Sequence, residues 1–398
     1  MNKKLLPTFV ILLFLVACTN EISTSASDTN NGNAEETGIS QGIIRGIITI
    51  DTRYGTPQPN FTAKDMMARG FNYGDLVHVQ IGDSINVVAP FVTAYSQVGI
   101  MGMSCCDYGA KGGTVDIGLV NGNFHERIGG NDGDSIIMTM KEKEGYLKEY
   151  NLLQGAYDNI PDNYPSDSAF ANFRKVTTTG MGDGRLYRGS NPLNADNNPV
   201  RFAYMDVFAR SAGIRTEIDL ADDDDMVMEQ LVKRQDTCTY CPSLFRNGNV
   251  VCLKMGVDNF SDDFKAKLKR GLLFMIDHEP PYLIHCNEGK DRCGFVSLLL
   301  EILMGADITE IQEDYMVTFE NYYKYPYRSE TWVLNQTLNV DRMLKLLFYP
   351  NLLDDIANMD WNVQIDATPT MLYTKTVEYL KSAGLTDSDI SKLKARLN

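Results

Sequence analysis

The sequence of 398 residues predicts two structural regions, an all-β region over residues 41–142 and an α/β region over residues 150–398. In the first region, short β-rich runs are separated by glycines and Asp/Asn pairs, which is typical of a small barrel or sandwich. In the second region, strand candidates alternate with helical patterns, which favours a central sheet flanked by helices. One short apolar run, residues 282–285, leads directly into a cysteine, five further residues, an arginine and a long apolar helix.

The first 40 residues predict a targeting segment followed by a tether. Lys3 and Lys4 precede an apolar run that is short for a spanning helix, and residues 15–18 (Leu-Val-Ala-Cys) have the form of a bacterial lipoprotein cleavage box. We therefore expect a lipoprotein signal peptide over residues 1–18, with Cys18 as the lipidated N-terminus; a secretory signal without lipid is the alternative. Residues 19–40 are polar and predict a disordered tether. The expected location is the cell envelope, on the extracytoplasmic face of a membrane.

The charge of the chain disfavours several classes of partner. Lys and Arg number 37 against 52 Asp and Glu, and removal of residues 1–17 would change the net charge from −15 to −17. Because nucleic-acid binding needs a basic surface, we expect no nucleic-acid partner. For the same reason, contact with a membrane would depend on the lipid on Cys18. The four histidines show no metal-ligand spacing, so no metal or other cofactor is expected. In an exported chain, Cys238 and Cys241 could form a local disulfide.

Five β-rich runs make up the predicted β region, over residues 43–50, 76–81, 87–95, 114–120 and 135–140. The region loosely resembles the C-terminal β-barrel of S-adenosylmethionine hydrolases and halogenases. The matching segments are residues 46–51 (Gly-Ile-Ile-Thr-Ile-Asp), residues 92–96 (Val-Thr-Ala-Tyr-Ser) and residues 121–134. Because the adenosyl-transfer chemistry of that family lies in another domain, we interpret the β region as a binding or spacing module.

In the α/β region, strands are expected at residues 185–188, 214–220, 250–253 and 282–285. A helical apolar stripe over residues 264–276 precedes the last strand, and the loop after that strand opens a buried helix. Capping boxes at residues 307–310 and 386–389 mark the starts of two later helices.

The loop between the last strand and its helix suits phosphate-ester chemistry. Residues 285–294 read His-Cys-Asn-Glu-Gly-Lys-Asp-Arg-Cys-Gly. Consecutive backbone N–H groups in such a loop form an anion cradle, and the helix N-terminus adds positive potential. The guanidinium of Arg292 can hold two phosphate oxygens at once. The same field favours the thiolate form of Cys286, which can then attack phosphorus.

The loop and its surroundings resemble the cysteine-dependent protein tyrosine phosphatases. They are most similar to a bacterial branch of dual or broad specificity, whose loop reads His-Cys, two variable residues, then Gly-Lys-Asp-Arg. Residues 187–193 (Tyr-Arg-Gly-Ser-Asn-Pro-Leu) resemble the first motif of the branch and residues 213–220 its second strand, while residues 304–306 and 314–316 fit its later helices. The resemblance covers residues 150–398 and implies a phosphoric monoester hydrolase that forms a cysteinyl-phosphate intermediate.

The resemblance also implies roles for individual residues. Cys286 is the expected nucleophile, Arg292 holds the equatorial phosphate oxygens, and His285 lies beneath the loop and orients Cys286. A general acid is expected roughly thirty residues before the cysteine, and Asp258 is the first choice ahead of Asp262 and Asp263. The expected substrate-binding residues are Asn287, Glu288, Gly289, Lys290, Asp291 and Arg188, the last of which could instead brace the loop, as could Ser190.

Two loop positions depart from the usual pattern of the family. Glu288 replaces a common alanine. Cys293 stands where many relatives have Ser or Thr, whose hydroxyl stabilises the departing thiolate. Because a thiol donates a weaker hydrogen bond, turnover could be slower, or Cys286 and Cys293 could form a reversible disulfide.

Three functions remain open at this point. The first is a protein phosphatase acting on phosphotyrosine or phosphoserine/threonine esters. The second is a phosphoinositide or inositol-phosphate phosphatase, which Lys290 favours, and the third is a surface binding protein with little turnover. The number of basic side chains around the pocket discriminates between the first two, and Arg188, Lys254 and Arg215 are the nearby candidates beyond Lys290 and Arg292.

Overall fold

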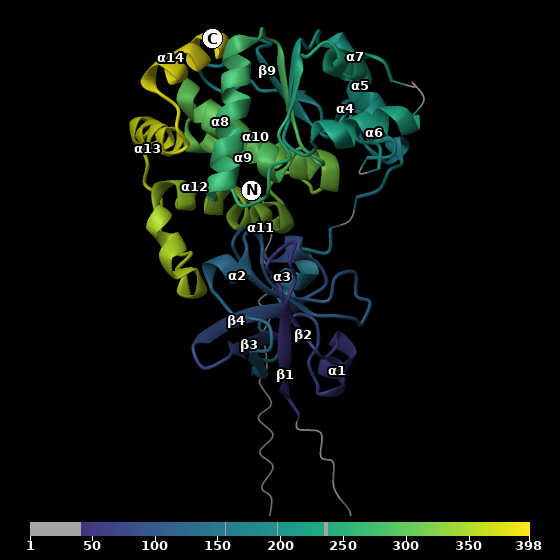
Figure 1. Cartoon of the computed structure of the whole chain (residues 1–398), viewed down its shortest axis with the longest axis vertical. Coiled ribbons are helices and arrows are strands. Elements are labelled where there is room, and N and C mark those ends of the chain that lie inside the picture. Colours follow the sequence, from purple (N-terminus) through teal and green to yellow (C-terminus); the bar gives the residue numbers. More distant parts are fainter. Residues whose placement is uncertain (1–40, 156, 197, 235–237) are drawn as a thin grey trace, which may run out of the picture. The chain divides into compact units, whose positions relative to one another are not determined.

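The computed structural model describes residues 41–155, 157–196, 198–234 and 238–398 (Figure 1). The predicted signal peptide with Cys18 and the predicted tether over residues 19–40 lie outside the described residues. Residues 40–398 form one compact unit. In the part of the chain that is described, no helix is both long enough and apolar enough to cross a membrane.

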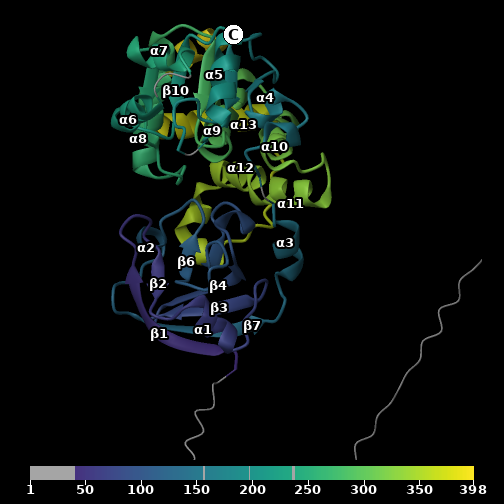
Figure 2. The ribbon, with the colours of Figure 1, turned by 90° about the vertical axis from the view of Figure 1, so that its right-hand side faces the viewer.

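The β region contains a seven-stranded, nearly closed sheet with the strand order β2-β1-β7-β3-β4-β5-β6 (Figure 2). All neighbouring strands are antiparallel except β4 and β5, which are parallel. The edge strands β2 and β6 are linked by a hydrogen bond of 2.8 Å from Gln58 Nε2 to Asp116 Oδ1. The strands are β1 (Ile43–Ile50), β2 (Pro57–Pro59), β3 (Leu76–Ile81), β4 (Ile85–Val92), β5 (Met103–Cys106), β6 (Asp116–Leu119) and β7 (Ser135–Glu142).

Hydrophobic alternation explains which of these strands the sequence predicts. In β3, Val77, Val79 and Ile81 are buried and their neighbours are partly exposed, as the period of two in a strand requires. Each of the five predicted runs overlaps a strand, so these predictions are confirmed. Neither β2 nor β5 was predicted, because β2 has only three residues and the wholly buried β5 carries no alternation. Short helices α1 (Ala63–Ala68) and α2 (Phe124–Arg127) and the 3-10 turn η1 (Tyr95–Gln97) connect the strands.

The α/β region is built on a five-stranded sheet with the order β11-β10-β12-β9-β8. The first four strands in this order are parallel and β8 is antiparallel to β9. In this register His285 lies beside Asp219 on one side and Gly189 on the other, so the residues that follow these strands meet at one edge. The strands are β8 (Arg174–Lys175), β9 (Leu186–Gly189), β10 (Thr216–Asp219), β11 (Val250–Cys252) and β12 (Tyr282–His285), and only the two-residue β8 was not predicted.

Helices cover both faces of this sheet (Figure 1). In β12, Tyr282 and Ile284 pack into the cluster around α8 and α9, whereas Leu283 packs into a second cluster with α5, α6 and α7. Both predicted capping boxes are present, before α10 and α14. The helices are α3 (Leu147–Leu152), α4 (Asp167–Phe170), α5 (Arg201–Ser211), α6 (Asp224–Arg234), α7 (Tyr240–Arg246), α8 (Asp262–Asp277), α9 (Asp291–Met304), α10 (Ile308–Tyr323), α11 (Glu330–Leu338), α12 (Val340–Phe348), α13 (Pro369–Ser382) and α14 (Asp387–Leu397), with 3-10 segments η2 (Pro161–Asn163) and η3 (Pro350–Asn358).

The β region is in direct contact with the turn between α11 and α12. The backbone N–H of Ile100 donates to the Leu338 carbonyl at 2.9 Å, and Arg342 Nη1 donates to the carbonyls of Val98 and Ile100 at 3.1 and 3.0 Å. Gly99 has a φ of +81°, and a Cβ at this position would lie 2.5 Å from the Leu338 oxygen. A glycine is therefore needed for the close approach of these two segments.

Neither of the disulfides considered from the sequence is formed. The sulfur atoms of Cys238 and Cys241 are not bonded to one another, nor are those of Cys286 and Cys293. Burial raises the pKa of the Cys241 thiol well above its ordinary value. The Cys293 thiol donates instead to the Ile284 carbonyl at 3.3 Å.

Candidate active site

Side chains from outside the loop after β12 hold it in place by donating hydrogen bonds to its backbone carbonyls. The side-chain amide of Asn198 donates to the carbonyl of residue 287 at 2.6 Å, and that of Asn172 donates to the carbonyl of residue 288 at 2.8 Å. Arg188 Nη2 donates to the carbonyl of residue 289 at 3.0 Å. Because a trans peptide directs its carbonyl and the following N–H to opposite sides, the N–H groups of residues 288–290 face the inside of the loop. N–H groups that face one side of a loop in this way are the arrangement that an anion cradle requires.

Two glycines allow this loop and the start of α9 to pack closely. Gly289 has a φ of +77°, and a Cβ there would lie 2.5 Å from the Gly189 oxygen. A Cβ at Gly294 would lie 2.3 Å from the ring of Tyr315. Any larger residue at either position would displace the backbone that carries the cradle.

Arg188 braces the loop from behind and is not part of the pocket lining. It is fully buried, and its Nη1 donates to Asp314 Oδ2 at 2.6 Å while Nη2 holds the Gly289 carbonyl. Burial alone would raise the pKa of Asp314, but Arg174 and Arg188 outweigh this effect and the pKa lies below its ordinary value. Ser190 is also buried and donates to a backbone carbonyl at 2.8 Å. The geometry therefore favours bracing over phosphate contact for both residues.

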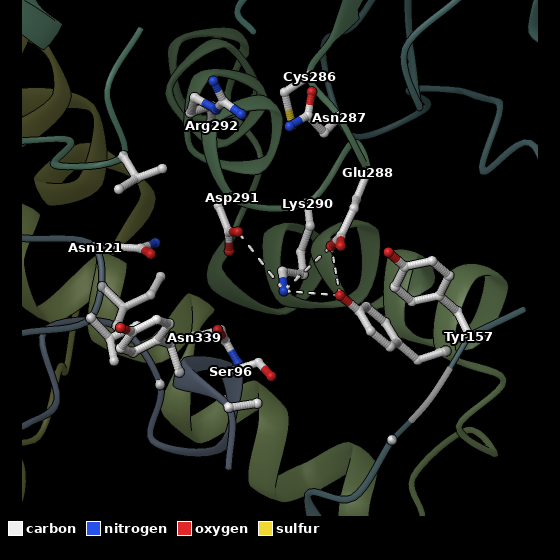
Figure 3. A pocket seen from close by; sticks show the side chains of 18 of the residues that line it. Ser96, Asn121, Tyr157, Cys286, Asn287, Glu288, Lys290, Asp291, Arg292 and Asn339 are labelled. Carbon is white, nitrogen blue, oxygen red and sulfur yellow. Dashed lines mark hydrogen bonds and ion pairs between the residues drawn. The ribbon is translucent and has the colours of Figure 1, made fainter. Parts of the chain in front are cut away.

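Cys286 and Arg292 lie side by side at one end of a pocket of about 520 Å³ (Figure 3). Cys286 is only 3% exposed. Arg292 Nη1 donates to the backbone carbonyls of Leu220 and Met255, at 3.2 and 3.0 Å. These two bonds use one terminal nitrogen of the guanidinium and fix the orientation of the rest of the group.

Lys290 lies in the same pocket between two carboxylates. Its Nζ is 3.1 Å from the Tyr323 hydroxyl, 3.6 Å from Glu288 Oε2 and 3.8 Å from Asp291 Oδ2 (Figure 3). Burial alone would lower the pKa of Lys290, but Asp291 and Glu288 outweigh it and the pKa is raised. Lys290 is therefore charged, and its charge is balanced within the loop.

Asp291 and Asp258 have different environments. Asp291 lines the pocket, its side chain is 29% exposed, and burial raises its pKa. Asp258 is not a lining residue; its Oδ2 accepts from Arg127 Nε at 2.8 Å and from Nη2 at 2.6 Å, although its neighbour Val257 does line the pocket. Asp263 forms an ion pair with Lys267 at the start of α8 and does not line the pocket.

His285 lies at the end of β12 and is fully buried. Its Nε2 is 3.8 Å from Glu217 and its Nδ1 is 3.8 Å from Asp219. Burial lowers the pKa of His285, but Asp219 and Glu217 outweigh this and raise it, whereas burial raises the pKa of Asp219 to about 7. His285, immediately before Cys286, and two carboxylates of the neighbouring strand β10 thus form a group of ionisable side chains that compete for protons.

The far side of the pocket comes from the β region, outside the phosphatase-like motifs. Ser96 lies across the pocket from Cys286, and Asn121 flanks it (Figure 3). Both residues belong to segments that resemble a family β-barrel, but that resemblance suggested only a binding or spacing module and did not place them at this site. The lining residues missed by the sequence analysis include Ser96, Tyr108, Asn121, Tyr157, Tyr323 and Asn339.

The fold and the site together define a phosphatase-like α/β protein whose strand–loop–helix segment carries a cysteine and an arginine. A model of the tyrosine phosphatase family matches residues 168–398, more than half of the chain, and the chain belongs to this family. The solved structures that match include the crystal structure of an uncharacterized conserved protein from Thermotoga maritima. It is 17% identical with a TM-score of 0.23, and the match spans 25% of this chain and 36% of that one. Curated proteins give no match.

Proposed function

We propose that this protein is a phosphoric monoester hydrolase with protein tyrosine or dual specificity. The thiolate of Cys286 attacks phosphorus, the Sγ–P bond forms, and the ester P–O bond breaks as its oxygen takes a proton. Water then attacks the cysteinyl phosphate, releasing inorganic phosphate and the thiolate. The observation that carries the proposal is the cradle of N–H groups over residues 288–290 with Arg292 beside Cys286. Such donors stabilise the charge that spreads over the phosphoryl oxygens in the transition state.

Asp291 is the side chain that we propose as proton donor to the leaving oxygen. It lines the same pocket as Cys286, and burial raises its pKa, so it keeps a proton to higher pH than an ordinary aspartate. Asp258, the first choice from the sequence, would have to leave its ion pair with Arg127 and enter the pocket.

A single phosphate group fits the charge of this pocket better than a polyphosphate does. Among the described residues, the basic lining side chains are Lys290 and Arg292, and the charge of Lys290 is already balanced. The other candidates do not contribute: Arg188 lies behind the loop, Lys254 pairs with Asp223 at 2.6 Å, and Arg215 lines a different cavity. This favours a phosphorylated protein over an inositol polyphosphate or a phosphoinositide.

The test is release of inorganic phosphate by the purified, reduced protein from a phosphotyrosine peptide, a phosphoserine peptide and an inositol polyphosphate. We expect hydrolysis of a peptide by wild type and none by Cys286→Ser. Mass spectrometry of acid-quenched wild type should show the phosphorylated cysteine. If wild type releases nothing from any of the three, the hydrolase proposal fails and a phosphate-binding role takes its place.

We further propose the lipoprotein form and the bacterial broad-specificity branch that the sequence suggests. The support is the Leu-Val-Ala-Cys box and the Gly-Lys-Asp-Arg loop at residues 289–292. Metabolic labelling with an alkyne fatty acid in a bacterial host should mark wild type but not Cys18→Ser. Equal labelling of the two proteins would contradict lipidation at Cys18.

A further inference from the structure

A second cavity, of about 550 Å³, adjoins the catalytic pocket on the side of the β region. The two cavities share a wall, because Tyr95, Tyr108, Val120, Asn121 and Val257 line both. The two cavities are therefore adjacent, and a ligand that extends from the phosphate at Cys286 along this shared wall reaches the edge of the second cavity.

The second cavity is acidic and aromatic. Its carboxylates are Asp51 and Asp116, its further aromatic ring is Tyr54, and among the described residues no Lys, Arg or His lines it. The carboxylate of Asp116 accepts hydrogen bonds from the Tyr95 hydroxyl and from Gln58 Nε2, the latter at 2.8 Å. These bonds fix the acid in place.

The carboxylate of Asp51 and the tyrosine rings of the second cavity suit a bound cation. Asp51 Oδ1 accepts from the backbone N–H groups of residues 53 and 54 at 3.0 and 2.7 Å, which holds the carboxylate in a turn. Tyr95 and Tyr108 stack with their ring centroids 6.0 Å apart, and Tyr108 is 61% exposed at the rim. A basic side chain gains from carboxylates and from tyrosine faces together, and the Arg53 guanidinium already lies 4.9 Å from the Tyr54 ring centroid.

The two cavities thus offer opposite charge preferences along one path. The catalytic end presents N–H groups and Arg292 to an anion, and the second cavity presents two carboxylates. Building on the proposed phosphatase function, we propose that the substrate is a phosphorylated peptide segment with a lysine or arginine near the phosphoresidue, and that this basic side chain binds in the second cavity. The amide of Asn121, which lines both cavities, is placed to contact the peptide between its two charged groups. Opposite charges at the two ends also fix the direction in which the segment binds.

The test compares matched phosphopeptides on the full-length protein. One set carries a single arginine scanned over the positions that flank the phosphoresidue, and the other carries glutamate or alanine at the same positions. We expect kcat/KM to be about tenfold higher for arginine at one or two of these positions, with the difference mainly in KM. The double variant Asp51→Asn, Asp116→Asn should reduce this preference to about twofold or less, and Asp51→Lys should favour the glutamate peptides.

Two controls separate the inference from the function on which it rests. Hydrolysis of p-nitrophenyl phosphate, which reaches only the catalytic end, should be unchanged in the double variant and shows that it is folded. Asp83→Asn removes an exposed acid that lines neither cavity and should leave the peptide preference intact. If the small ester is hydrolysed but arginine peptides are not preferred, or if the preference survives in the double variant, the inference is overturned. If the small ester is not hydrolysed by wild type, the phosphatase function itself fails.

Discussion

The two sides of the catalytic pocket are built in different ways. On the loop side, three successive carbonyls are held by Asn198, Asn172 and Arg188, and the brace continues to Asp314. On the side of the β region, the lining residues stand on connecting segments such as the 3-10 turn over residues 95–97 and the turn after β6. This side is joined to the α/β region by hydrogen bonds of residues 98–100 with the α11–α12 turn, by the pair Arg127–Asp258 and by apolar packing, because buried side chains of both regions belong to one hydrophobic cluster.

This difference matches the demands of chemistry and of selection. Transition-state stabilisation needs donors fixed to within a fraction of an ångström, which explains the dense bonding of the loop. Discrimination among substrates needs only that the surface beyond the phosphate has the right charge and shape. We therefore expect changes on the loop side to affect kcat for every substrate, and changes on the β side to affect the choice of substrate.

Apart from removal of the nucleophile, the largest loss of catalytic activity is expected for Arg292→Lys. The lysine keeps the charge, but it has one nitrogen, whereas the guanidinium can hold two phosphate oxygens while its Nη1 binds the carbonyls of Leu220 and Met255. We expect kcat/KM to fall by about 10²–10³-fold for peptides and for p-nitrophenyl phosphate alike. Steady-state kinetics on both substrates measure this. A loss confined to peptides would place Arg292 in substrate selection and contradict its role in the chemistry.

The next largest effect is expected for Asp291→Asn. If Asp291 donates the proton, kcat should fall by about 10–10²-fold for substrates with a poor leaving group and much less for p-nitrophenyl phosphate. Because burial raises the pKa of Asp291, activity in wild type should decline on the alkaline side as this acid loses its proton, and the variant should lack that decline. Asp258→Asn is the matched control and should lower kcat by less than about threefold. The reverse ranking would restore Asp258 as the general acid.

A structural feature of this protein can be predicted from the sequence when the residues that form it are close together in the chain. The cradle, its nucleophile and its arginine are adjacent in the chain, and strand β12 and helix α9 follow from apolar runs that flank them. Asp258 illustrates the limit: its spacing to Cys286 predicts a catalytic acid, but its partner Arg127 lies 131 residues away in the chain. Ser96 and Asn121 line the catalytic pocket because segments that are distant in the chain pack together, and the spacing of residues in the sequence does not predict such packing.

A smaller effect on activity, confined to the choice of substrate, is expected for Arg127→Met, together with a loss of stability. The Arg127–Asp258 pair is partly buried, with side chains 18% and 15% exposed, and it fixes the segment that carries Val257 on the wall shared by the two cavities. Loss of the pair should lower the free energy of unfolding by about 1–3 kcal/mol. The preference among phosphopeptides should change by a few-fold, while p-nitrophenyl phosphate is hydrolysed as before. Chemical denaturation and peptide kinetics measure the two effects, and an equal loss on all substrates would show that the pair supports the chemistry itself.

The smallest effect on activity, and a distinct one on stability, is expected for Asp219→Asn beneath the loop. The pKa of Asp219 is raised to about 7 in the folded state from an ordinary value of 3.8, and that of His285 is raised as well. The folded protein therefore binds more protons than the unfolded chain between these values, so the stabilisation is fully present below about pH 4 and is lost as the pH rises through about 7.

Urea denaturation at pH 5 and pH 8 tests this expectation. Wild type should lose on the order of 2 kcal/mol of unfolding free energy between the two pH values, and Asp219→Asn should lose clearly less. Asp83→Asn, which alters an exposed acid of the β region, should behave as wild type. If Asp219→Asn shows the full wild-type slope, the charge cluster under the loop does not set the pH dependence of stability.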